Sequence, residues 1–130
     1  SGTILAVIPT ALRTVLKSVT KYTNNTGNSS AASAVTATTD YFFLLSEYEV
    51  FGTISRGNPN ESSKQAQYSY YSAGNSKVKY NHIVTSTAVT WWLRSVDINY
   101  YFTFVRVRAD GTVMATDADY SYGFAPGFDL

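Results

Sequence analysis

The sequence predicts a single α+β domain over residues 1–130, with a helix first and an antiparallel sheet last. Three observations support this prediction: an apolar repeat of helical period near the start, alternating apolar residues in the last third, and turn-forming residues between them. Since 45% of the 130 residues are hydrophobic, one core of ordinary size can form, whereas two domains would be crowded.

The first expected element is a helix over about residues 9–20. Pro9 suits a first helical turn, and Lys17 and Lys21 suit a helix C-terminus. The following segment, 24–39, is a run of small and polar residues, which predicts a solvated loop and the most mobile part of the chain. The apolar residues at helical spacing are Leu5, Ile8, Leu12, Val15, Leu16 and Val19.

The middle of the chain contains one strong local signal. Residues 41–45 are a compact apolar strand candidate, and Ser46 with Glu49 matches a capping box before a short helix that Gly52 ends. Residues 55–63 are turn formers, 65–72 are ambiguous between helix and strand, and 77–84 are a possible strand.

The last third predicts the sheet. Residues 89–95 alternate, 102–108 form a second strand, and a turn at 109–112 leads into a third strand at 113–116. A closing strand follows, in which Pro126 requires an edge or a bulge. The residues expected in the core are Trp91, Leu93, Phe104, Val105, Val107, Phe124 and Phe128.

Several classes of function find little support. Lys plus Arg total 10 and Asp plus Glu total 9, so no strong field gathers nucleic acid, and the apolar stretch 4–8 is too short for membrane insertion. Cysteine is absent and His82 is the single histidine, which argues against zinc and against His-dependent catalysis. Asp117 and Asp119 lack the glycine and glutamate spacing of an EF-hand. We therefore expect neither an enzyme nor a metal or other cofactor.

Three segments carry a resemblance to a known family. They are Phe43 to Gly52, Trp91-Trp92-Leu93-Arg94-Ser95, and Gly123-Phe124-Ala125-Pro126-Gly127-Phe128. In order and spacing they resemble a family of phage and bacterial surface domains with a C-type-lectin-like fold, akin to formylglycine-generating enzymes. The resemblance runs from about Ile4 to Leu130. Its gut-phage members include variable proteins of diversity-generating retroelements, which implies a virion (phage tail) or a bacterial cell surface as the location.

Two departures from that family shape the expectations. Family domains carry an upstream helix and an N-terminal strand that pairs with the C-terminal strand, and this chain begins after them. The resemblance therefore implies that the closing strand at 123–130 lacks its neighbour, so that a companion N-terminal fragment or a homo-oligomer supplies it. The calcium-and-sugar motif of true lectins and the cysteines of formylglycine-generating enzymes are absent, so neither activity carries over.

The retroelement resemblance has a check within the sequence. Such systems vary template adenines, and the codons reached from AAC do not encode Lys, Glu, Gln, Met or Trp. Residues 96–122 contain none of Lys, Glu, Gln or Trp and one Met, Met114. A short β-rich segment can also lack these residues by chance, because they are infrequent in the whole chain.

The predicted function is a ligand-binding display domain that recognises a protein or glycan on a bacterial cell surface, as in host-receptor recognition. The chain has 11 Tyr, and tyrosine supplies contact area at low rotamer cost. One alternative is a structural module of a larger surface protein, with the same aromatics buried against neighbouring chains. Another is a divergent enzyme, for which no catalytic cluster is found. The predicted recognition residues are Asp97, Asn99, Tyr100, Tyr101, Thr103, Arg106, Arg108, Asp117, Asp119, Tyr120 and Tyr122.

Overall fold

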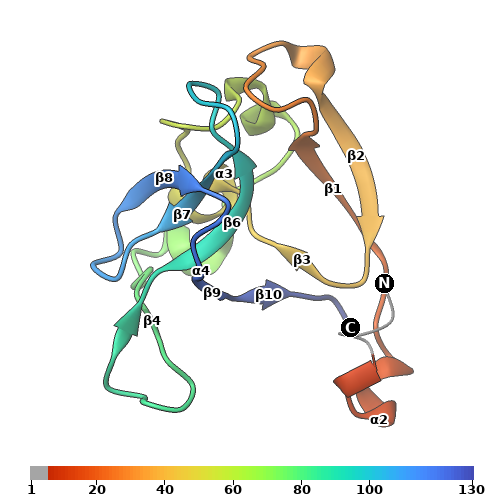
Figure 1. Ribbon diagram of the computed structural model, residues 1–130. Coiled ribbons are helices and arrows are strands. Elements are labelled where there is room, and N and C mark those ends of the chain that lie inside the picture. Colours follow the sequence, from red (N-terminus) through yellow and green to blue (C-terminus); the bar gives the residue numbers. More distant parts are fainter. Residues whose placement is uncertain (1–5) are drawn as a thin grey trace.

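The computed structural model describes residues 6–130 as a mixed domain of short strands and a few short helices, which confirms the α+β class. Figure 1 shows a hairpin of β1 and β2 beside the sheet, with β3 and β10 running between the two. In order, the elements are α2 (Thr10–Arg13), β1 (Val19–Asn24), η1 (Ala32–Ala34), β2 (Val35–Asp40), β3 (Phe43–Leu44), α3 (Glu47–Phe51), η2 (Pro59–Ser63), α4 (Ser69–Ser72), β4 (Lys79–Tyr80), β5 (Ala88–Val89), β6 (Trp91–Val96), β7 (Thr103–Val107), β8 (Val113–Asp117), β9 (Gly123–Phe124) and β10 (Pro126–Gly127).

The principal sheet has the strand order β8-β7-β6-β9. Strands β6, β7 and β8 are antiparallel neighbours, while β9 runs parallel to β6. Gly111 turns the chain between β7 and β8 with a φ of 85°, a conformation that glycine adopts without strain. The three strands predicted at 89–95, 102–108 and 113–116 are confirmed, and β6 lies inside the sheet as expected.

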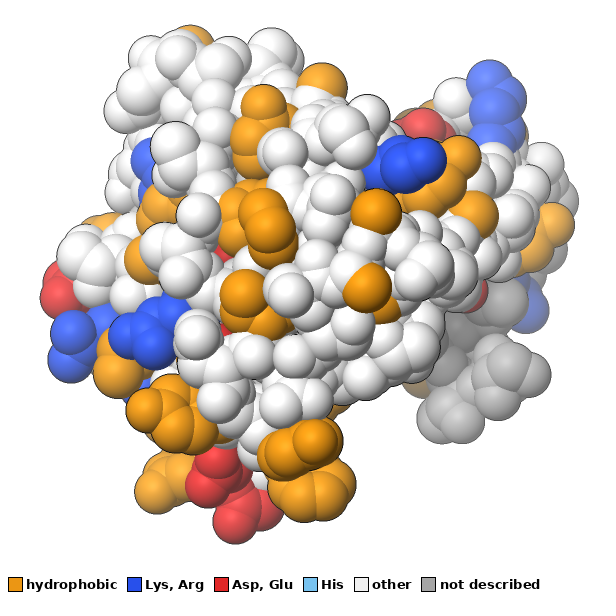
Figure 2. Space-filling model, turned by 90° about the horizontal axis from the view of Figure 1, so that it is seen from above, with side chains coloured by type: hydrophobic (Ala, Val, Ile, Leu, Met, Phe, Trp, Pro, Cys, Tyr) orange, Lys and Arg blue, Asp and Glu red, His pale blue; other side chains and the backbone are white. Residues whose placement is uncertain are grey.

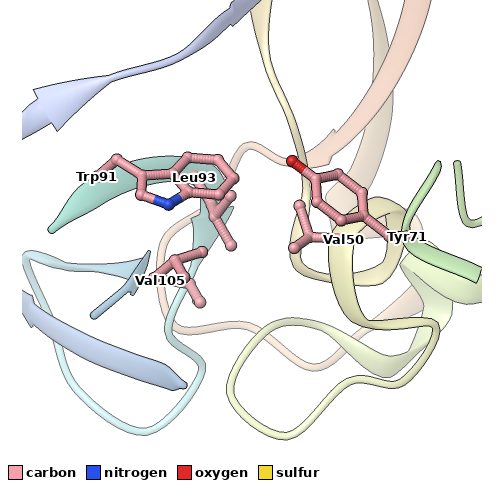
Figure 3. Close-up of a cluster of buried hydrophobic side chains, with 6 residues drawn as sticks. Val50, Tyr71, Trp91, Leu93 and Val105 are labelled. Atoms are coloured by element: carbon pink, nitrogen blue, oxygen red, sulfur yellow. The ribbon is translucent and has the colours of Figure 1, made fainter. Parts of the chain in front are cut away.

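The core lies between this sheet and the two short helices α3 and α4. Figure 3 shows Trp91 and Leu93 of β6 and Val105 of β7 facing Val50 of α3 and Tyr71 of α4. Trp91 is 1% exposed, and its indole Nε1 donates to the carbonyl of Lys77 at 3.0 Å. The predicted burial of this indole is therefore confirmed.

Three phenylalanines predicted in the core lie outside it. Phe104 is half-buried on the opposite face of β7 from Val105. Phe124 is 62% exposed, because its register partner on β6 is Trp92, which lies on the face turned away from the core. Phe128 is 42% exposed, and its ring centroid lies 5.8 Å from that of Phe42, outside the core cluster. The prediction of core positions was wrong for these residues.

The N-terminal third differs most from the sequence-based expectation. Instead of a helix over 9–20, a single helical turn at Thr10–Arg13 precedes strand β1, which pairs with β2 from Val19 opposite Asp40 to Asn24 opposite Val35. The predicted loop over 24–39 is therefore wrong for β2. Helical spacing misled here because β-branched residues such as Val19 and Thr20 also favour strands, and antiparallel pairing satisfies the backbone of a polar segment.

The capping box is confirmed. The hydroxyl of Ser46 accepts from the amide of Glu49 at 3.1 Å, and a carboxylate oxygen of Glu49 accepts from the amide of Ser46 at 2.8 Å. Gly52 ends α3 in the left-handed conformation, with a φ of 69°.

The closing segment is paired within the chain, contrary to expectation. Strand β9 pairs with β6, β10 pairs with β3, and Lys17 forms a bridge with Asp129. A Cβ on Gly127 would lie 2.5 Å from a ring carbon of Phe43, so glycine allows this close approach. The family architecture was carried over wrongly at this point, and the expected companion fragment or strand-paired oligomer loses the basis on which it was predicted.

Candidate functional site

The predicted recognition residues fall into buried and exposed groups. Asp97 is 1% exposed and Thr103 is 7% exposed, so their placement on a display surface was wrong. Asp97 Oδ1 accepts from the backbone amide and the side-chain amide of Asn99, both at 2.9 Å, and Thr103 Oγ1 donates to the carbonyl of Tyr100 at 2.9 Å. These two buried side chains instead hold the backbone of the tip loop (residues 97–102) through these hydrogen bonds.

The tip loop presents aromatic side chains to solvent. Tyr100 is 64% exposed, Tyr101 is 70% exposed and Phe102 is 83% exposed, and Asn99 is exposed beside them. Phe102 has a φ of 63°, an uncommon conformation for a residue with a side chain. Phe102 was not among the predicted recognition residues, although its place in an aromatic run between two strands was a usable signal.

A second group, half-buried except for the exposed Tyr120, lies on the sheet face turned away from the core. Tyr122 stacks on Tyr120 with a centroid distance of 5.9 Å and an interplanar angle of 7°, and its centroid lies 5.2 Å from that of Trp92. Trp92 meets Phe104 edge-on at 6.5 Å, and the guanidinium carbon of Arg106 lies 4.9 Å from the Tyr122 ring centroid. We call these five residues the aromatic cluster.

The cluster combines predicted and missed residues. Arg106, Tyr120 and Tyr122 were predicted, whereas Trp92 and Phe104 were missed. The period-2 alternation contained the signal, since Trp92, Phe104 and Arg106 all alternate with buried neighbours on β6 and β7. Even-numbered residues of these strands therefore share the outer face.

The remaining predicted residues are not joined to the cluster. Arg108, Asp117 and Asp119 are exposed at the strand ends. Within residues 6–130 both salt bridges end on Glu49, so these three charges are not paired there. Figure 2 shows the face at the top of Figure 1, where hydrophobic side chains form several separate groups rather than one continuous patch.

A buried charged network was not predicted: it joins Glu49 of α3 to Arg94, on the even-numbered face of β6, and to Lys21 of β1. Glu49 forms salt bridges with Arg94 at 2.5 Å and with Lys21 at 2.9 Å. Burial alone would raise the pKa of Glu49, but the hydrogen bond and charge of Arg94, and then Lys21, outweigh it and lower that pKa. Burial would likewise lower the pKa of Lys21, but its hydrogen bonds with Tyr68 and Glu49 raise it. The network therefore holds its charges ionised.

Two further glutamates, both at most 1% exposed, fasten loops to the sheet. Glu47 accepts from the amide and hydroxyl of Ser55, both at 2.8 Å, from the amide of Arg56 at 3.2 Å and from the amide of Gly57 at 2.7 Å. Glu61 accepts from the hydroxyl of Ser95 at 2.8 Å and from the amide of Asn24 at 3.1 Å.

Burial raises the pKa of Glu61, against the lowering effect of its hydrogen bonds with Ser95 and Asn24. Both glutamates are thus occupied in holding backbone and hydroxyl donors. In the part of the chain described, no group of three or more His, Cys, Asp or Glu side chains is arranged to hold a metal ion. Nor is any helix there long and apolar enough to cross a membrane.

The fold and the site define a small α+β domain that fastens its loops with buried carboxylates and presents aromatic side chains on one sheet face and at one loop. The chain belongs to a family described as a domain of unknown function, DUF6273, whose model matches residues 2–130. No curated protein and no solved structure matches it.

Proposed function

We propose that this domain is a ligand-binding module whose recognition surface consists of the tip loop and the aromatic cluster. The observation that carries the proposal is the stacking of Tyr120, Tyr122 and Arg106 on the outer face of the sheet. Aromatic and arginine side chains dominate the binding energy of recognition surfaces because they bury large areas at low entropic cost. A sheet that is packed on its other face gives them a rigid base.

The separation of scaffold and surface supports the same proposal. Trp91, Leu93 and Val105 are at most 1% exposed and stabilise the sheet, whereas the tip loop contributes nothing to the core cluster. Substitutions at the exposed positions can therefore change what is bound without changing the fold.

The resemblance to C-type-lectin-like surface domains supports a finer proposal. In this finer proposal the fold is C-type-lectin-like, and residues 96–122 form a variable surface that recognises a protein or glycan on a bacterial cell. The domain itself would belong to a phage tail protein or to a bacterial surface protein. The support is the order of the three sequence motifs and the codon-restricted composition of 96–122. Most predicted recognition residues in this interval, including Tyr100, Tyr101 and Tyr120, are exposed.

The alternative is a structural module in which neighbouring chains cover the same aromatics. Exposure in a single chain is compatible with either function, so the two must be separated by measurement. A structural module predicts self-association that depends on the tip loop and the aromatic cluster, whereas a ligand-binding module predicts a monomer that captures a foreign partner.

The experiment compares Tyr101→Ser and Tyr120→Ser with wild type in binding to immobilised bacterial surface extracts, alongside thermal melts. Each variant should lose about thirtyfold in affinity, which corresponds to about 2 kcal/mol, and should melt as wild type does. Tyr41→Ser is a matched control, because Tyr41 is 48% exposed and lies outside both groups. Unfolding of the two variants, or concentration-dependent self-association that they abolish, would favour the structural module.

A further inference from the structure

Among residues 6–130, Arg106 is a cation without a salt-bridge partner in the middle of the aromatic cluster. Its Nε is buried and finds no hydrogen-bond acceptor in that part of the chain, where both salt bridges end on Glu49. By contrast, Arg94 on the adjacent strand donates to the carboxylate of Glu49 and to the carbonyl of Leu44. Arg94 is thus used for structure, whereas Arg106 donates to no acceptor within residues 6–130.

The surroundings of Arg106 hold its guanidinium in place. The Tyr122 ring lies 4.9 Å away, and that ring is itself stacked on Tyr120 and packed against Trp92. A guanidinium held over an aromatic ring keeps its planar fork pre-organised, so less entropy is lost when two of its N–H groups bind one carboxylate. Partial exclusion of water also strengthens a charge-assisted hydrogen bond.

The exposed side chains of this surface favour a protein over a small ligand or a single sugar. The cavities beside the cluster range from about 130 Å³, where Trp92 and Phe104 meet Leu44, to about 760 Å³ beside Tyr122, so the choice rests on the side chains and not on cavity size. The tip loop projects Phe102, which is 83% exposed, and such a side chain needs a pocket on the partner.

We propose that Arg106 anchors an Asp or Glu carboxylate presented by a partner protein, with the surrounding aromatic rings packed against apolar surface of that partner. The proposal rests on the proposed binding function and names the chemistry of its ligand. The carboxylate accepts two parallel hydrogen bonds from the guanidinium, and Tyr122 excludes water from one side of the pair. Arg106 then determines specificity, because a partner with a basic or neutral residue at this place leaves a half-buried cation unpaired.

The first test uses small probes on the intact chain. Sodium acetate is titrated against sodium chloride at equal ionic strength, while the Nε–H resonances of the arginines are followed by NMR. The Arg106 resonance should shift and saturate with acetate and not with chloride, and the resonance of Arg108, an exposed arginine on the same chain segment, should follow ionic strength alone. Equal responses of Arg106 to both anions would overturn the proposal.

The second test separates protein from saccharide. An acidic peptide with Glu beside Leu and Phe, the same peptide with Gln for Glu, and a tetragalacturonate are each titrated by calorimetry. The Glu peptide should bind at least tenfold more tightly than the Gln peptide, and Arg106→Lys should remove that difference because a lysine lacks the bidentate fork. Arg108→Lys is the matched control and should retain it.

The outcomes are distinct. Preference for tetragalacturonate over the Glu peptide would overturn the protein partner in favour of an acidic glycan. A Glu preference that survives Arg106→Lys would overturn the role of Arg106. Failure of the proposed function itself would show differently, as unfolding or self-association in the Tyr101→Ser and Tyr120→Ser variants, neither of which changes Arg106.

Discussion

The sheet and the segments packed around it are stabilised by different kinds of interaction. Strands β6 and β7 bury Trp91, Leu93, Val105 and Val107. The hairpin β1–β2 and the loop at 55–57 are instead tied down by glutamate and asparagine side chains. Asn24, for example, donates from one side-chain nitrogen to the carbonyls of Gly27 and Ser29, both at 2.7 Å. A domain with a small apolar core can therefore order long polar loops when each buried polar side chain serves several partners.

The largest effect is expected in the apolar region. Trp91→Ala removes a buried indole and leaves a cavity, which should cost about 3–5 kcal/mol in the free energy of unfolding. Urea unfolding measures this cost. Trp92→Ala is the neighbouring control and should cost clearly less, because Trp92 is half-buried on the outer face. A larger loss at Trp92 would mean that the outer face, and not the inner one, carries the core.

The polar region should be nearly as sensitive. Glu47→Ala leaves the amides of Ser55, Arg56 and Gly57 without their acceptor. The amide of Gly57 is buried, and an unsatisfied buried donor costs about 1–3 kcal/mol, so we expect a loss of about 2–3 kcal/mol in urea unfolding. Amide hydrogen exchange should accelerate first at residues 55–57. Retention of wild-type stability would show that these loops do not depend on the carboxylate.

The pH dependence of stability distinguishes Glu61 from Glu49, two buried glutamates whose pKa values are shifted in opposite directions. Because the pKa of Glu61 is raised from its ordinary value of 4.5, its favourable contribution is present below that value and is lost as pH rises through the raised value. Glu61→Gln should therefore lose less stability than wild type between about pH 4.5 and neutrality. Urea midpoints measured across this range provide the check.

Glu49 supplies the internal control for that measurement. Its pKa is lowered, so its contribution is present above 4.5 and is lost as pH falls through the lowered value. Wild type and Glu61→Gln should both lose stability on that acidic side. A Glu61→Gln variant whose pH profile matches wild type throughout would contradict the role of burial at Glu61.

The smallest effect is expected at the tip loop. Tyr101→Ser removes a ring that is 70% exposed, and it should change the free energy of unfolding by no more than about 0.5 kcal/mol. Asp97→Ala, at the start of the same loop, should cost more, because Asp97 is buried and accepts two hydrogen bonds from Asn99. Equal costs would mean that the loop has no separate support beneath its surface.

The same contrast explains what the sequence could predict. Apolar alternation reports which side of a strand is buried, so β6, β7 and β8 were found, and a capping box is a local motif, so α3 was found. Strand β1 was missed because its burial depends on pairing with β2 and not on its own apolar residues. The three buried glutamates were missed because carboxylates are usually exposed, and only the folded chain brings their donors together.

The candidate site shows the same limit. Tyrosine content and loop position correctly indicated Tyr100, Tyr101 and Tyr120 as exposed. Asp97 and Thr103 were wrongly predicted to be exposed because polar side chains usually are. Their positions indicated burial, since both continue the alternation of the buried residues on β6 and β7. Strand parity is thus a better guide to burial than side-chain polarity in this sheet.

The pairing of the closing segment has a mechanical consequence. Lys17 bridges Asp129, β10 pairs with β3 over two residues, and β9 pairs with β6 over two residues, whereas β6 and β7 lie deeper in the sheet. A force applied through residues 17 and 129 would therefore break the bridge between Lys17 and Asp129 first, then the pairing of β10 with β3, and then that of β9 with β6. The core strands β6 and β7 would bear the force only afterwards. Tension would release residues 123–130 from the domain while the tip loop, at the far end of the molecule in Figure 1, kept its shape.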